Sequence, residues 1–265
     1  MYDIIYGNGD SYASGQDLVE HLYFPEKKLY SFDEWKPVQR KNVDRAMKWS
    51  RENPKIDIKS LEKQECYISK LGKLTNTPVL NNAVSGAGFQ KISMTTLNDL
   101  LELKEKHNKI LCVISFTSAQ RLWFPGETGH TNKSDTIVLG GFTDFKDKLS
   151  HKVMKRFVMN TNYMDWALQM AASYLGIIKF CEYFDIDVTF IGTPLMNKHH
   201  FQEFINNGHG SLVEPFIDYY GGTLGGDTIW DAVRDHTKKV FSAGGHLPVE
   251  HHDQIAVELK EKFWT

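Results

Sequence analysis

Residues 109–116 read Lys-Ile-Leu-Cys-Val-Ile-Ser-Phe, an almost unbroken apolar run that is rich in β-branched side chains. A strand with one face in water alternates apolar and polar residues, so this run predicts a strand covered on both faces. Such strands are typical of parallel sheets packed between helices. Shorter apolar runs at 2–6, 78–84 and 187–194 predict further strands of the same sheet.

Segments with helical spacing separate these runs. Apolar residues recur at intervals of three and four in 14–23, where Ser14 is a candidate N-cap, and in 94–107, 162–184 and 251–264. This alternation predicts an α/β fold with three layers, α/β/α, around a central parallel sheet. The chain has 265 residues, 41% of them hydrophobic, which suits one domain spanning 1–265. Residues 24–75, rich in Lys, Glu, Trp and Pro, predict a helical insertion.

Charge and composition argue against several classes of partner. The net charge of -2 gives no basic footprint for nucleic acid, and no run reaches the length of a membrane span. We therefore expect neither nucleic acid nor membrane as a partner. Cys66, Cys112 and Cys181 are too widely spaced for a disulfide framework, and the N-terminus does not resemble a signal peptide. These features favour a reducing compartment and a cytoplasmic location.

No cofactor or metal is expected from the sequence. Gly7 and Gly9 are followed by the next glycine only at position 15, too late for a dinucleotide fingerprint, and the glycine-rich turn 221–226 has no P-loop lysine. Histidines gather in the last quarter of the chain, but the adjacent pairs among them lack the i, i+4 spacing of a helical zinc motif. These histidines are His199, His200, His209, His236, His246, His251 and His252.

Polar loops follow the predicted strands. Because the carboxyl ends of parallel strands meet at one edge of a sheet, we expect loops 7–14, 85–90 and 117–124 to lie close together. A fourth polar segment, 243–252, precedes the last predicted helix. Functional side chains of parallel α/β folds gather at this edge, so the loops are the first place to look for a site.

Four blocks in these loops resemble the SGNH (GDSL-type) hydrolase family, and they occur in the family's order. They are Gly9-Asp10-Ser11, Asn-Asn-Ala-Val-Ser-Gly-Ala-Gly at 81–88, Ser-Phe-Thr-Ser at 115–118 and Gly-Gly-His-Leu-Pro-Val-Glu-His-His at 244–252. The resemblance spans both ends of the chain and covers about half of it. It implies a flavodoxin-like α/β fold and a serine nucleophile.

The resemblance also implies roles for individual residues. Ser11 falls at the position of the nucleophile and His246 at that of the catalytic histidine. The oxyanion hole would use the backbone N–H groups of Ser11 and Gly86 together with the hydroxyl of Thr117. Asp10, Asn81 and His252 fall at supporting positions. Read from the residues alone, Ser11 can also be a turn or capping residue, Gly86 a turn glycine and His246 a surface histidine.

Two positions depart from the family pattern. The third block normally reads Gly-x-Asn, and here it is Ser115-Phe116-Thr117. The family places an aspartate three residues before the catalytic histidine, and here that residue is Ala243. Glu250, Asp253, Asp227, Asp231 or a backbone carbonyl can take over the support of His246. The substituted third block, followed by Arg121, resembles variants of the family carried by bacteriophages.

The sequence therefore predicts a divergent SGNH-type serine ester hydrolase, an esterase or deacetylase. It would act through an acyl-serine intermediate on a small-molecule or glycan acyl ester that the sequence does not identify. Two alternatives remain open. One is a degenerate member of the fold that binds a ligand or glycan without turnover. The other is a structural or interaction protein that uses the aromatic-rich helix 162–184 as a contact surface.

Overall fold

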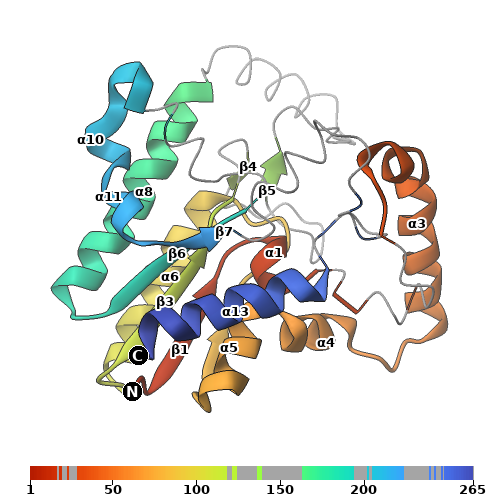
Figure 1. Cartoon of the computed structure of the whole chain (residues 1–265), viewed down its shortest axis with the longest axis horizontal. Helices are drawn as coiled ribbons and strands as arrows, with labels where there is room; N and C mark the ends of the chain where they lie inside the picture. The colour runs from red at the N-terminus through yellow and green to blue at the C-terminus, as the bar shows by residue number, and fades with distance from the viewer. Residues whose placement is uncertain are drawn as a thin grey trace.

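A parallel sheet of five strands forms the centre of the molecule in a computed structural model of the chain (Figure 1). The structure describes residues 1–16, 18–19, 23, 29–117, 121–123, 136–138, 163–193, 202, 205–223, 239, 242, 246 and 248–264. The strands are β1 (Ile4–Asn8), β2 (Val79–Asn81), β3 (Ile110–Ser115), β6 (Asp187–Gly192) and β7 (Tyr220–Thr223). All neighbouring pairs are parallel, so the predicted fold class is confirmed.

The strand order is β2-β1-β3-β6-β7. From β1 the chain first moves to one side, to β2, and then returns to place β3 on the other side. The carboxyl ends of β1 and β3 therefore flank the point where the connections diverge. In open α/β sheets this switch point is where a crevice for ligands forms.

Helices cover both faces of the sheet, which gives the expected layers (Figure 1). On one face α6 (Phe89–Lys104) packs against α8 (Tyr163–Tyr183), and on the other α5 (Tyr67–Thr75) packs against α13 (Val249–Phe263). In β3, Cys112 and Ile114 belong to the first core and Leu111 and Val113 to the second. Successive side chains of a strand point to opposite faces, so both sets must be apolar. This explains the unbroken apolar run.

The apolar side of helix α8 is buried in the core and does not form a free surface. Its buried residues are Trp166, Ala167, Met170, Ala171, Tyr174, Ile177, Ile178 and Cys181. These side chains pack with strand residues such as Phe190 and with Phe116 after β3. The aromatic residues of this segment are thus explained in part by packing against the sheet.

The described part of the predicted helical insertion contains three helices with different surroundings. They are α3 (Phe32–Glu52), α4 (Ile58–Glu65) and α5. Helix α3 begins with a capping box between Ser31 and Glu34 and stands to one side of the sheet (Figure 1). Helix α5, by contrast, packs on the sheet and on α13, so it serves as the crossover between β1 and β2.

Two local predictions were wrong. Ser14 does not cap a following helix; it is the last residue of α1 (Ser11–Ser14), whose N-cap is Asp10. Part of the expected turn at 221–226 is β7, where glycine is needed because a Cβ on Gly221 would lie 2.5 Å from the Thr189 hydroxyl oxygen. Strand pairing with β6 therefore outweighs the turn preference of glycine here.

Short elements complete the described chain. Strands β4 (Arg121–Trp123) and β5 (Thr136–Val138) form an antiparallel pair, and η1 (Ile205–His209), α10 (Gly210–Val213) and α11 (Pro215–Asp218) lead into β7. None of the described helices combines the length and the apolar character that crossing a bilayer requires.

Candidate active site

The carboxyl end of β1 is fixed by Asn8, a buried residue that sequence reasoning did not single out. Its side-chain amide donates to the hydroxyls of Thr95 (2.8 Å) and Thr96 (3.0 Å) on α6. Its carbonyl oxygen accepts the N–H of Gly9 at 2.8 Å. One side chain thus ties the loop after β1 to the helix beside it.

Gly9 and Asp10 set the turn that leads into α1. Gly9 has φ of +149°, and a Cβ there would lie 2.7 Å from the Cβ of Ser115 on β3, so a larger residue does not fit. Asp10 caps α1, since its Oδ1 accepts the N–H of Tyr12 at 3.1 Å. Ser11 is consequently the first residue of a short helix at the switch point.

The Asp10 carboxylate also joins the loops of β1 and β3. It is fully buried, and its Oδ2 accepts the Thr117 hydroxyl at 3.2 Å. The Ser115 hydroxyl lies 3.5 Å from Oδ1, at the limit of a hydrogen bond. These contacts explain Asp10 as a residue that organises the loop.

The Ser11 hydroxyl is buried at the switch point and, like those of Tyr67 and Tyr174, is unpaired among the described residues. Ser11 is 2% exposed, and its Oγ has no hydrogen-bond partner among the described residues. Nearly all buried polar side-chain atoms have a partner, so an unpaired one calls for an explanation, of which a catalytic role is one.

The loop after β2 lies against the Ser11 helix. The N–H of Val84 donates to the carbonyl of Gly9 at 3.1 Å, and the Ser85 hydroxyl bonds the side chain of Gln16. The turn bond runs from Ala87 N–H to the Val84 carbonyl, with Gly86 at φ of +79° inside the turn. The structure therefore brings Gly86 into the same loop cluster as Ser11.

Asn81 and Thr117 are held inside this cluster. The Asn81 amide donates to the carbonyl of Ala13 in α1 at 2.9 Å, which links β2 to α1. The Thr117 hydroxyl lies 3.1 Å from the carbonyl of Ala87 and also reaches Asp10. A hydroxyl has one proton, and both neighbours are acceptors, so that proton is committed within the protein.

His246 approaches the site from the far end of the sequence. Its imidazole packs on the ring of Tyr12, with ring centroids 5.1 Å apart and planes at 60°. Its carbonyl accepts the N–H of the buried Ser242 at 3.2 Å. The structure thus places His246 beside the residue that follows Ser11, although the Ser11 hydroxyl is not bonded to it.

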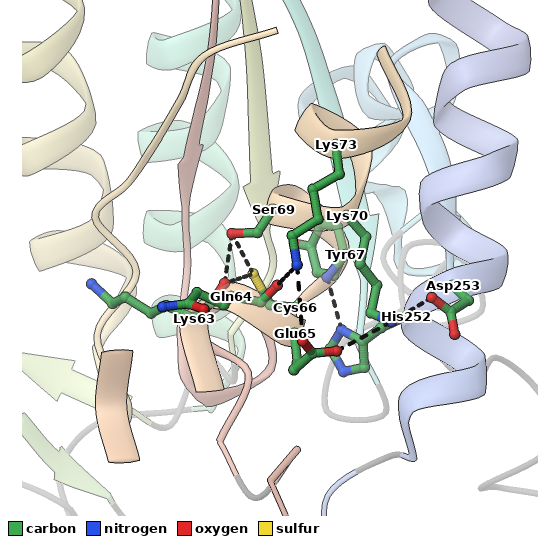
Figure 2. Close-up of polar contacts among 10 residues, drawn as sticks. All are labelled: Lys63, Gln64, Glu65, Cys66, Tyr67, Ser69, Lys70, Lys73, His252 and Asp253. Carbon is green, nitrogen blue, oxygen red and sulfur yellow. Dashed lines mark hydrogen bonds and ion pairs between the residues drawn. The ribbon is translucent and has the colours of Figure 1, made fainter. Parts of the chain in front are cut away.

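His252 anchors the start of α13 to α5, as Figure 2 shows. It is 1% exposed, and its Nδ1 accepts the N–H of Tyr67 at 3.1 Å. The two rings also stack, with centroids 5.7 Å apart. Burial, together with the nearby Lys70, His251 and His246, lowers the pKa of His252 to about 3, so the ring is neutral at pH 7.

Asp253, one of the four carboxylates that the sequence offers as support for His246, has another partner. Asp253 forms an ion pair with Lys70, which also lies 3.6 Å from Glu65 (Figure 2). Glu250 is an exposed residue in the first turn of α13. Asp227, Asp231 and Ala243 itself lie outside the described residues.

The charge of Asp10 acts on two buried tyrosines that were not identified from the sequence. Tyr67 comes from one core and Tyr174 from the other, and neither hydroxyl has a hydrogen-bond partner of normal geometry among the described residues. Burial raises the pKa of both phenols, and the charge of Asp10 raises each further. Both therefore remain protonated donors beside the loop cluster. Only their position in the fold reveals them.

Within the described part of the chain, no three His, Cys, Asp or Glu side chains come together in a way that could hold a metal ion. His199, His200 and His236 lie outside that part.

Comparisons with known proteins add little to this geometry. No protein-family model matches the sequence, and no curated protein matches it significantly. Among solved structures the chain is similar to one from Desulfitobacterium hafniense DCB-2 named as a "putative lipolytic protein of G-D-S-L family". That match covers 98% of each chain at 9% identity with a TM-score of 0.37, a level too low to carry an argument.

Proposed function

We propose that this chain is a serine ester hydrolase with Ser11 as its nucleophile and His246 as its base. The observation that carries the proposal is the buried hydroxyl of Ser11 at the switch point, unpaired within the described part of the chain, with His246 in contact with the adjacent Tyr12. A serine hydroxyl becomes a useful nucleophile when a neighbouring base removes its proton, and a histidine within reach can do so.

In this mechanism the Ser11 oxygen attacks the ester carbonyl while His246 takes the hydroxyl proton. The backbone N–H groups of Ser11 and Gly86 hold the oxyanion, while the Thr117 proton stays with its internal acceptors, Asp10 and Ala87. The intermediate then expels the alcohol, which receives the proton from His246. Water, activated by the same base, releases the acid from Ser11. Because the hydroxyl is buried, the covering side chains must move to admit an ester.

Labelling with a fluorophosphonate, read by intact mass, tests the proposal. The wild type should gain the mass of one phosphonyl group, and Ser11→Ala should gain none and should lose hydrolysis of a short p-nitrophenyl ester. Ser14→Ala is the matched control, because Ser14 lies in the same helix and its hydroxyl bonds only the Ser11 carbonyl among the described residues. Equal turnover by Ser11→Ala and wild type would refute the assignment.

A binding protein without turnover is the second candidate. Two observations favour it: the Ser11 hydroxyl is not hydrogen-bonded to His246, and the Thr117 proton is committed to internal acceptors. This candidate predicts that the fluorophosphonate leaves the wild type unmodified, so the same experiment separates the two.

A further inference from the structure

Tyr12 and His246 form an edge-to-face pair at the border of the candidate site. Their centroids are 5.1 Å apart with an interplanar angle of 60°, within the range in which aromatic pairs attract. Tyr12 directly follows Ser11 in α1. One short helix therefore carries the proposed nucleophile and the ring that contacts the proposed base.

The Tyr12 ring has little freedom to move. Its backbone N–H is bonded to Asp10, and the residue is 8% exposed. The ring belongs to the core formed with α5 and α13, which includes Tyr67 and Ile255. A side chain fixed at its backbone and packed at its ring is a rigid surface for a neighbour to rest on.

We propose that Tyr12 is a positioning residue for His246. The inference rests on the proposed function. Contact with a fixed ring limits the tilt of the imidazole and so restricts the directions in which its ring nitrogens can point during the reaction. Small misplacements of a reacting group lower rates strongly. An edge-to-face aromatic contact also contributes attraction beyond the area that it buries.

This role is compatible with support from a carboxylate. A carboxylate bonds a ring nitrogen in the plane of the imidazole, whereas an aromatic neighbour restricts the orientation of that plane. Tyr12 acts on His246 whichever group binds the other ring nitrogen. Tyr12, the residue after the proposed nucleophile, thus has a proposed role in addition to its part in the turn and in the core.

The test compares Tyr12→Leu, which removes the ring, with Tyr12→Phe, which keeps it. For Tyr12→Leu we expect kcat and the rate of fluorophosphonate labelling to fall roughly 2- to 10-fold, the range of an edge-to-face aromatic contact, with KM unchanged. Tyr12→Phe should stay within about twofold of the wild type, because it keeps the aromatic ring that contacts His246. Tyr23→Leu is the control, because it removes another buried tyrosine that makes an edge-to-face contact. The ring centroids of Tyr23 and Trp49 are 5.4 Å apart.

Ring-proton NMR signals of His246, assigned by their loss in His246→Asn, give a readout independent of activity. They should shift in Tyr12→Leu and remain in place in Tyr12→Phe. Labelling of Tyr12→Leu at the wild-type rate, or an equal loss in Tyr23→Leu, overturns the role of Tyr12 while leaving the proposed function intact. A wild type that is not labelled at all refutes the proposed function instead.

Discussion

At the scale of single residues, the Thr117 hydroxyl connects two loops that the sequence places far apart. It reaches the Asp10 carboxylate and the Ala87 carbonyl from a fully buried position. Thr117→Val keeps the shape and removes the donor, so Asp10 loses one of its hydrogen bonds. We expect the free energy of unfolding to fall by about 1–3 kcal/mol, measured by denaturant titration.

The activity of Thr117→Val shows whether Thr117 only connects the loops or also donates to the oxyanion. Loss of an oxyanion donor lowers kcat by about 10²–10³-fold. With its proton bound internally, Thr117 should instead lower kcat less than about tenfold, and Thr117→Ser should restore both properties. A loss of several hundredfold at unchanged stability would contradict this expectation.

At the scale of elements, the start of α13 depends on the neutral ring of His252. Its pKa in the folded chain, about 3, lies below the ordinary value of 6.5, so the unfolded chain binds the proton first. The contribution of neutral His252 to the free energy of unfolding is therefore fully present above pH 6.5. It falls by about 1.4 kcal/mol per pH unit as the pH drops from 6.5 towards 3.

His252→Asn keeps a hydrogen-bond acceptor near the Nδ1 position and cannot titrate. Its melting temperature should decline less steeply than that of the wild type between pH 6.5 and 4, in thermal scans at matched ionic strength. His209→Asn is the control, since His209 is a partly buried histidine in another element, η1. Parallel slopes for wild type and His252→Asn would show that this histidine is not the group that titrates.

At the scale of the whole molecule, the two cores meet at β1 and β3, which lie inside the sheet, and β3 is buried along its length. Segments with many buried contacts open only in global unfolding, whereas edges open locally. Native-state hydrogen exchange should therefore protect the amides of β1 and β3 most strongly. Amides of α3, which carries exposed residues such as Val43 and Met47, should exchange through smaller openings. Greater protection in α3 than in β3 would contradict this view of the fold.

The sequence by itself determined the class of fold and the position of most strands and helices. Burial on both faces leaves a local signal, and the run that became β3 was visible because each of its side chains meets one of two cores. It also indicated the loop edge where Asp10, Ser11, Gly86 and Thr117 lie, because parallel strands end together.

Only the tertiary structure decided which side chains meet. The Tyr67–His252 bond joins residues 185 positions apart, and nothing in the local pattern of either helix specifies it. The contact of Tyr12 with His246, the anchoring of β1 by Asn8 and the strand at Tyr220 depend in the same way on distant partners. Local spacing encodes the periodicity of burial, whereas a hydrogen bond or ring contact between distant segments exists only once the chain has packed.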